Sequence, residues 1–164
     1  DPGSINGGLF RSEGFEVETI GRITDNLQVL AGFGALDAEV VRSDSLNPGD
    51  QIQGVPETTA NLWLSYDWND GPLEGLGVGA GAFYRGDIVT QFSQFVGTYE
   101  TDSYLTADIS SWYRTGLSNG VDLKFGLTMQ NVFDEEYGVG GFGGGVQAGQ
   151  PRTLIASVGI AMNL

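Results

Sequence analysis

The sequence predicts an all-β chain: a segment of an antiparallel up-and-down transmembrane β-barrel with about seven to eight strands, short periplasmic turns and long extracellular loops. Three observations predict this class. Seven segments alternate apolar and polar residues with period two, as strands with two different faces do. The connections between these segments are alternately short and long. Glycine is abundant, with 27 of 164 residues, and only 17% of residues are charged, whereas soluble domains carry about a quarter.

The first four predicted strands each have one apolar and one polar face. In residues 15–23, Phe15 and Val17 lie on one face and Glu16 and Glu18 lie on the other. Side chains alternate in this way because successive Cβ atoms of a strand point to opposite sides of the sheet. The same alternation predicts strands over residues 27–35, 60–68 and 76–85.

The last three predicted strands cover residues 104–114, 121–130 and 154–164. None of the 36 positions on the seven apolar faces is charged. A charge that faces hydrocarbon costs about 2–4 kcal/mol near the bilayer midplane, so lipid would impose this segregation. The charged residues of the opposite faces are Glu16, Glu18, Arg22, Asp67, Arg85, Asp108, Arg114, Asp122 and Lys124.

A soluble antiparallel sandwich is the alternative fold, because its strands also alternate. The two inner faces of a sandwich fill a common core. Here the apolar faces are rich in alanine and glycine, and charges lie in the middle of the opposite faces. Segments of nine to eleven residues also suit a tilted membrane crossing. These features favour the barrel.

The connections predict which end of each strand lies outside the cell. Residues 24–26, 69–74 and 115–120 form short connections, whereas residues 41–59, 86–102 and 131–150 form long ones. Strict alternation sends all the long loops to one end, and outer-membrane barrels have their longer loops on the extracellular side. The predicted aromatic girdle consists of Trp68 and Tyr113 at the periplasmic side and Phe15 and Tyr84 at the outer side.

The composition excludes several kinds of site. The chain has no histidine and no cysteine, which excludes disulfides, thiolate metal sites and histidine-dependent catalytic triads. We therefore expect no enzyme activity and no cofactor. The net charge of −14 argues against nucleic acid as a partner. The acidic pairs Glu135/Glu136 and Asp37/Glu39 lack a loop of spaced oxygen ligands, so no metal site is predicted.

Several short motifs resemble the C-terminal barrel of TonB-dependent receptors, particularly the siderophore group. Residues 131–137 (NVFDEEY) are similar to the family pattern NLFDxxY, and residues 149–153 (GQPRT) are similar to the GxPRT that opens the last strand. Weaker matches in the family order are residues 11–18 (RSEGFEVE), 32–39 (GFGALDAE), 55–63 (VPETTANLW) and 75–87 (GLGVGAGAFYRGD). The resemblance marks Asn131, Phe133, Asp134, Tyr137, Pro151 and Arg152 as structural motif residues.

This resemblance implies that residues 1–164 are the C-terminal part of a receptor barrel in the outer membrane of a Gram-negative bacterium. Such a receptor takes up ferric siderophores or similar large, scarce ligands. The implied partners are outer-membrane lipid, the ligand, the barrel-assembly machinery, and the TonB energy coupler acting through a plug that would precede Asp1. Two features depart from the family pattern: the chain ends in Leu164 where an aromatic residue is usual, and seven strands do not close a 22-stranded barrel.

Ligand contacts are predicted at Phe83, Arg85, Phe92, Phe95 and Tyr99, near the outer rim and upper lumen. An arginine offers a fork of donors to a carboxylate or catecholate, and aromatic rings stack on planar groups. The alternative is that Phe92, Phe95 and Tyr99 only pack their own loop together.

Neither of the two glycine-rich segments is predicted to bind phosphate. Gly77, Gly79 and Gly81 lie within a predicted strand with no helix after it, so they predict a bare lumen face that another backbone can approach, or a bend. Residues 140–145 predict a flexible, solvated loop, with Phe142 as a possible tip contact.

Two other functions compete with transport. Seven strands leave two open edges, so a released fragment could assemble into a structural oligomer or filament. A small autonomous barrel that acts as a pore or adhesin would require a hidden eighth strand in residues 4–10, because bacterial single-chain barrels use even numbers.

Overall fold

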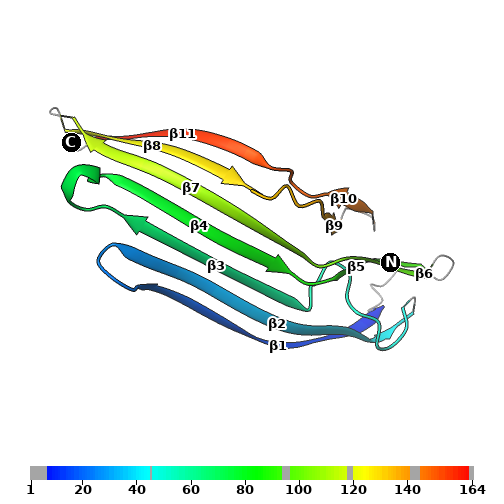
Figure 1. The fold of residues 1–164 in the computed structure, drawn as a ribbon. Coiled ribbons are helices and arrows are strands. Elements are labelled where there is room, and N and C mark those ends of the chain that lie inside the picture. The colour runs from blue at the N-terminus through cyan, green and yellow to red at the C-terminus, as the bar shows by residue number, and fades with distance from the viewer. Residues whose placement is uncertain (1–6, 45, 94–96, 118–119, 141–144, 163–164) are drawn as a thin grey trace, which may run out of the picture.

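The computed structural model describes residues 7–44, 46–93, 97–117, 120–140 and 145–162. Most of these residues form one antiparallel sheet of seven strands, in the order β1-β2-β3-β4-β7-β8-β11 (Figure 1). Each strand is hydrogen-bonded to the next one along the chain within this sheet, which is the up-and-down topology that the sequence predicts. The strands are β1 (Gly8–Arg22), β2 (Leu27–Ser43), β3 (Thr58–Asp67), β4 (Leu76–Arg85), β7 (Tyr104–Gly116), β8 (Val121–Gln130) and β11 (Thr153–Met162).

The long connections emerge at one end of the sheet and are partly folded. Two of them contain hairpins, one of β5 (Ile88–Ser93) with β6 (Gly97–Thr101), the other of β9 (Gly138–Gly140) with β10 (Val146–Ala148) (Figure 1). The opposite end carries the short turns and a 3-10 turn, η1 (Gly71–Leu73). The alternation of connection lengths is therefore confirmed. The hairpins within these two connections were not predicted; each forms because the backbone of the segment pairs with itself.

The first two strands are longer than the alternation alone indicates. The β1 strand begins at Gly8 rather than near Phe15, and β2 continues to Ser43, so the two pair along their whole length. The eighth strand considered for residues 4–10 is wrong for residues 8–10, which belong to β1. Residues 4–6 lie outside the described part of the chain.

The strand registers join the predicted apolar faces into one continuous surface. Phe33 pairs with Val17 on one side and Ala60 on the other; Ala60 then pairs with Tyr84, and Tyr84 with Leu105. A slip of one residue at any of these pairings would move a whole strand's apolar set to the polar face. The structure therefore confirms the alternation.

The sheet buries neither of its faces within the described residues, where the buried apolar side chains are Ala38, Val40, Ile88 and Val89. All four lie at the outer end of the molecule, and Gly54 N–H donates to Val89 O there. Large apolar side chains of the sheet stay exposed, including Phe15 at 61% and Val158 at 66%. A sandwich would cover them with a second layer, and the described residues form none. The sandwich alternative is wrong, and the exposed face is suited to lipid.

Two tryptophan side chains cover the glycine track of β4. A Cβ added at Gly79 would lie 2.5 Å from the Trp63 indole, and one at Gly77 or Gly81 would overlap the indole of Trp112 or Trp63, respectively. The expectation of a bare lumen face is therefore wrong at these positions. The glycines make room for indole rings from the two strands that flank β4.

Among the described residues, no helix has the length and apolar character needed to cross a membrane.

Candidate functional site

The upper part of the polar face brings Arg85 next to aromatic side chains. Arg85 in β4 pairs with Thr59 on one side and Tyr104 on the other. Its side chain is half-buried, and its Nε is buried without a hydrogen-bond partner in the described part of the chain. No described carboxylate forms an ion pair with it. The guanidinium is therefore available to an anionic or oxygen-rich ligand.

A hollow of about 190 Å³ lies on the same face of the sheet, and Arg85 is not among the residues that line it. Phe83 lines it from β4, and Tyr137 lines it from the connection after β8. Tyr137 also stacks on Tyr104, with ring centroids 4.0 Å apart and an interplanar angle of 24°. Stacked rings at the wall of a polar hollow can bind a planar, oxygen-rich group. The remaining lining residues are Thr106, Asp108, Gln130, Asn131 and Gln150.

Phe83 and Arg85 are predicted site residues, whereas Tyr104 is a candidate that the sequence did not reveal. The alternation alone places Tyr104 on the polar face of its strand. Its position beside Arg85 depends on the register of β4 with β7, which the sequence does not contain. An aromatic residue on the polar face near the extracellular strand end was the available signal.

The β5–β6 hairpin carries the other three predicted ligand residues. Tyr99 is 59% exposed, and its carbonyl accepts a hydrogen bond from the Thr90 hydroxyl at 3.0 Å. Phe92 pairs with Thr98 through the backbone. Phe95 lies outside the described residues, as does the side chain of Phe92. The role of these three residues stays a prediction.

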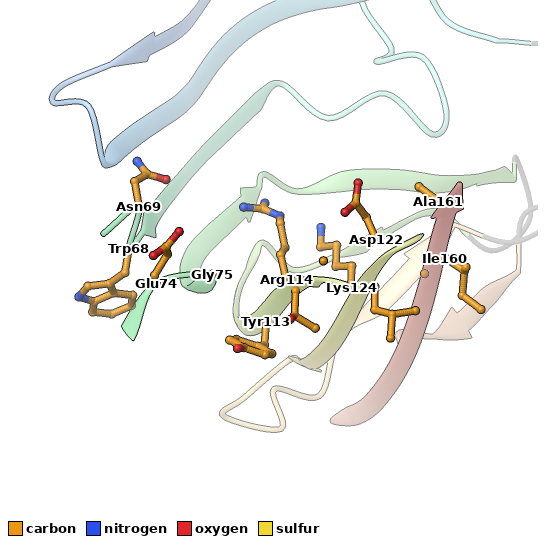
Figure 2. Close-up of a pocket in the computed structure, with 14 residues that line it drawn as sticks. Trp68, Asn69, Glu74, Gly75, Tyr113, Arg114, Asp122, Lys124, Ile160 and Ala161 are labelled. Atoms are coloured by element: carbon orange, nitrogen blue, oxygen red, sulfur yellow. The ribbon is translucent and has the colours of Figure 1, made fainter. Parts of the chain in front are cut away.

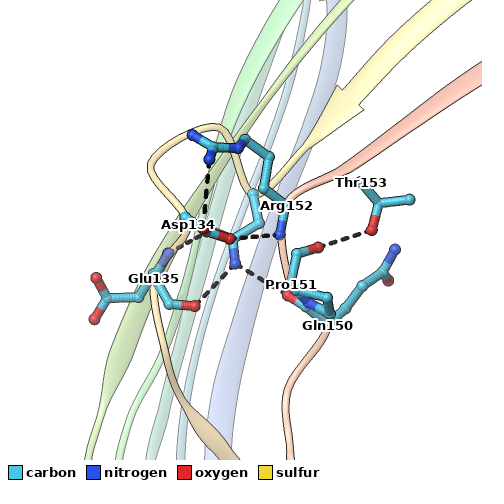
Figure 3. A network of polar contacts seen from close by, with 7 residues as sticks. Asp134, Glu135, Gln150, Pro151, Arg152 and Thr153 are labelled. Atoms are coloured by element: carbon cyan, nitrogen blue, oxygen red, sulfur yellow. Dashed lines mark hydrogen bonds and ion pairs between the residues drawn. The ribbon is translucent and has the colours of Figure 1, made fainter.

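Asn131 is the centre of a hydrogen-bond network that joins β8 to β11. Figure 3 shows its partners Glu135 and Gln150. It is 3% exposed and has a left-handed backbone, with φ 49°. Its Nδ2 donates to Glu135 O at 2.9 Å and Gln150 O at 3.0 Å, and its Oδ1 accepts from Glu135 N–H at 2.9 Å. Its own N–H donates to Asp108 Oδ1 at 2.9 Å. One amide thus holds both ends of the connection between β8 and β11.

Asp134 extends this network to the start of β11. It also has a left-handed backbone, with φ 58°. Its Oδ1 accepts from Arg152 N–H at 2.9 Å, and its Oδ2 lies 3.4 Å from the Arg152 guanidinium (Figure 3). Pro151 O accepts from the Thr153 hydroxyl at 2.8 Å. The two short motifs therefore contact each other, although Asn131 and Gln150 are 19 residues apart in the sequence.

Two further motif residues have different surroundings. The Tyr137 hydroxyl accepts from Gln150 N–H at 3.2 Å, and Tyr137 O accepts from Gly149 N–H at 2.7 Å. This fixes the ring that stacks on Tyr104. Phe133, in contrast, is 80% exposed. The network therefore holds Tyr137 at the hollow and leaves Phe133 outside it.

The periplasmic end of the polar face holds a second cluster, next to a hollow of about 790 Å³. Asp67 Oδ1 accepts from Trp112 Nε1–H at 2.8 Å and from Arg114 Nη1–H at 2.7 Å. Lys124 lies 5.6 Å from the Trp112 ring centroid. Figure 2 shows the side chains of Arg114, Lys124 and Asp122 on one side of the sheet, whereas Trp68 and Tyr113 point to the other side. The cluster orients the two cations along the polar face.

Replacing Asp67 by asparagine is expected to lower the free energy of unfolding by about 0.5–1 kcal/mol. The amide oxygen can still accept from Trp112, but the attraction to Arg114 is lost, and that guanidinium is half-exposed. Chemical unfolding of the folded receptor in detergent at low and high salt is the measurement. The difference between wild type and variant should shrink at high salt, because salt screens an exposed ion pair. A difference that is independent of salt would contradict an electrostatic origin.

No group of three or more acidic side chains within the described residues is arranged to hold a metal ion.

The chain matches known outer-membrane receptors over nearly its whole length. It is 28% identical over 152 residues to the metal-pseudopaline receptor CntO of Pseudomonas aeruginosa, covering 92% of this chain and 21% of that protein. It is 29% identical over 134 residues to the ferrichrome outer membrane transporter/phage receptor of Escherichia coli K12, covering 82% of this chain and 17% of that protein. The chain therefore spans about a fifth of the length of these relatives.

Solved structures show the same fold. The ferric-catecholate import receptor Fiu of Escherichia coli K12, in its closed form, superposes with a TM-score of 0.74 at 30% identity, over 92% of this chain and 21% of that chain. The ferric preacinetobactin receptor BauA of Acinetobacter baumannii superposes with a TM-score of 0.83 at 21% identity, over 95% and 23% of the two chains. The latter likeness concerns the fold alone.

The family model described as "TonB dependent receptor-like, beta-barrel" matches residues 3–132, which is most of the 164 residues. This agrees with the continuous apolar face of the sheet, the up-and-down topology and the long connections at one end. The chain belongs to the TonB-dependent receptor β-barrel family, whose barrels lie in the outer membrane of Gram-negative bacteria.

Proposed function

We propose that this chain forms wall strands and outer loops of a TonB-dependent receptor that takes up a ferric siderophore or a similar large, scarce ligand. The family match over residues 3–132 carries the proposal. The relatives are named as receptors for metal-pseudopaline, ferrichrome and catecholate siderophores, and they are transport receptors rather than enzymes. On this proposal the chain binds and guides a ligand and catalyses no reaction.

The arrangement around Arg85 supports a ligand contact in the upper lumen. Its guanidinium has no described ion-pair partner, and Phe83 and Tyr104 flank it on the same face. A guanidinium donates in parallel to the paired oxygens of a carboxylate or catecholate, and rings stack on planar chelating groups. We propose Phe83, Arg85, Tyr104 and Tyr137 as the contacts, with Phe92, Phe95 and Tyr99 acting from the outer hairpin.

Replacing Arg85 by glutamine in the full-length receptor is expected to weaken binding of the ferric chelate about tenfold, or about 1.4 kcal/mol. Glutamine keeps a donor but loses the charge and the fork. Equilibrium binding to cells that carry the receptor, with radioactive iron in the chelate, is the measurement. Arg22→Gln is the matched control, since Arg22 lies on the same face of the sheet in β1, at the periplasmic end, and is exposed. Equal losses from the two variants would mean that only overall charge matters.

An apolar track on the polar face supports contact with a plug. Ile20 pairs with Leu30, and Leu30 pairs with Trp63, so these side chains form a row across three strands. Ile20 is 78% exposed and Leu30 is 42% exposed. A water-filled lumen favours polar side chains, whereas 22-stranded outer-membrane transporters have a plugged lumen. We propose that the plug covers this track and transmits the action of the TonB energy coupler.

We propose further that residues 1–164 correspond to the C-terminal part of the barrel, folded into lipid by the barrel-assembly machinery. The similarity of residues 149–153 to the motif that opens a last strand supports this placement. The edges of β1 and β11 are unpaired within the described residues, so further strands are needed for closure. The same open edges also suit the competing function, a self-assembling β-structured fragment.

The intact mass of the native polypeptide, with peptide mapping upstream of Asp1, separates these two functions. The receptor function requires a mass several times larger than 17.4 kDa, with plug and barrel peptides before Asp1. A native mass near 17.4 kDa, together with oligomers that bury the β1 and β11 edges, would instead establish the self-assembling fragment.

A further inference from the structure

The lipid-facing side of the sheet contains a groove of about 520 Å³. Between β3 and β8 its lining comes from β4 and β7, where the small side chains of Ala80 and Ser111 pair with those of Ile109 and Val78, respectively. Leu64 and Tyr66 of β3 line one side, and Leu127 and Met129 of β8 line the other. The registers of the sheet place all these side chains on the apolar face.

The lining of this groove is almost wholly apolar and carries no charged residue. The side-chain polar groups on this face are the hydroxyls of Tyr66 and Ser111. Ser110 also borders the groove, but its hydroxyl lies on the polar face, 3.0 Å from the Thr128 hydroxyl. A protein interface carries about one hydrogen bond per 100–200 Å², and this groove offers few groups to make them. Its chemistry therefore fits a hydrocarbon chain better than a protein surface.

One end of the groove meets the aromatic side chains at the periplasmic end. Tyr66, in the groove wall, contacts Trp68 with ring centroids 4.8 Å apart. Tyr113 follows Ser111 on the same face of β7. Tryptophan and tyrosine at such positions mark the boundary between hydrocarbon and polar headgroups. A chain in the groove would thus have its polar end at this boundary.

We propose that the groove holds one acyl chain of a phospholipid from the periplasmic leaflet in a fixed position. The groove is continuous with the surface by which this outer-membrane family faces the bilayer, so hydrocarbon already surrounds it. Side chains of β3 and β8 flank the groove, so a chain in it makes contacts with both flanks as well as with β4 and β7. The headgroup lies at the level of Trp68 and Tyr113, which fixes the direction of the chain along the sheet.

Photocrosslinking of the full-length receptor tests this proposal. The receptor is placed in vesicles of phosphatidylethanolamine and phosphatidylglycerol that contain a phospholipid with a diazirine on one acyl chain. The crosslinked residues are then mapped by mass spectrometry. We expect the groove residues to be labelled about tenfold more than other lipid-facing positions, such as Ala107. This ratio corresponds to an acyl-chain preference for the groove of about 1.4 kcal/mol. Even labelling along the lipid face would overturn the proposal.

Filling the groove is the matched test. Ala80→Leu is expected to abolish the excess labelling, and Ser111→Leu should do the same from the neighbouring strand. Ala82→Leu is the control, because Ala82 lies on the same face of the same strand and does not line the groove. Loss of labelling in all three variants, preferential labelling by a lipopolysaccharide probe, or a second protein on the groove in native mass spectra would each contradict a phospholipid site.

Discussion

Replacing Asn131 by alanine is expected to lower the free energy of local opening around the β8–β11 connection by about 3–5 kcal/mol. The substitution removes two donated hydrogen bonds, to the carbonyls of Glu135 and Gln150, and one accepted bond from Glu135 N–H. Asn131 is 3% exposed, so water does not readily replace these bonds. Alanine also tolerates a φ of 49° less well than asparagine does.

Peptide-resolved hydrogen exchange of the full-length receptor measures this effect. The amides of Glu135 and Arg152 should exchange much faster in Asn131→Ala, because the first loses its acceptor and the second depends on the position of Asp134. Asn131→Asp is the matched variant: it keeps an acceptor for Glu135 N–H and tolerates the left-handed backbone, but it cannot donate. We expect an effect at least as large as that of alanine, because the second carboxylate oxygen would be buried against the Glu135 and Gln150 carbonyls. Unchanged exchange in the alanine variant would show that the network does not hold the connection.

This opening should also reach the proposed ligand site. Tyr137 lies in the same connection, and its hydroxyl accepts a hydrogen bond from Gln150 N–H. If the connection opens, the Tyr137 ring no longer stacks at 4.0 Å on Tyr104. Weaker ligand binding in Asn131→Ala, together with faster exchange, would therefore connect the two short motifs to the upper lumen.

Replacing Gly77 by alanine is expected to lower the free energy of unfolding by about 2–4 kcal/mol. A Cβ at this position would overlap the Trp112 indole, so the ring must move away. Movement of the ring breaks the 2.8 Å hydrogen bond from Nε1–H to Asp67 Oδ1. Asp67 is 9% exposed. It would lose the Trp112 indole N–H as a hydrogen-bond donor and keep the Arg114 guanidinium.

Denaturant unfolding in detergent, followed by tryptophan emission, measures this change. Gly21→Ala is the matched control, because Gly21 also lies within a strand and nothing lies within 4 Å of the added Cβ. The double variant Gly77→Ala with Trp112→Ala should be less destabilised than the sum of the two single variants, since the overlap is absent once the indole is removed. Strict additivity would contradict a steric conflict between these two residues.

Much of the fold could be predicted because the determining pattern is local. Residues i and i+2 of a strand lie on one face. The uncharged faces of residues 15–23 and 60–68 can therefore be predicted without knowing which strands pair with these segments. Connection length is equally local, and it predicted which ends gather the long segments. The hairpins β5–β6 and β9–β10 were missed, because their pairing depends on contacts across a turn rather than on long alternating runs.

The candidate site was less accessible to prediction. Arg85 and Phe83 are two residues apart in one strand, so alternation alone places them on the same face. Tyr104 and Tyr137 join them only through strand register and through the stacking of rings 33 positions apart. The motif residues Asn131 and Asp134 were recognised by resemblance, but the resemblance did not indicate which atoms they bind.

The sequence by itself determined the alternating strands, the two chemically different faces and the end at which the long connections gather, since each of these follows from neighbouring residues. The tertiary structure decided which polar side chains meet and how glycine is used. The sequence predicted a bare face at Gly77, Gly79 and Gly81, yet indoles from adjacent strands occupy that space. The reason is physical: side-chain contacts across a sheet depend on register, and register is a property of paired strands rather than of any one of them.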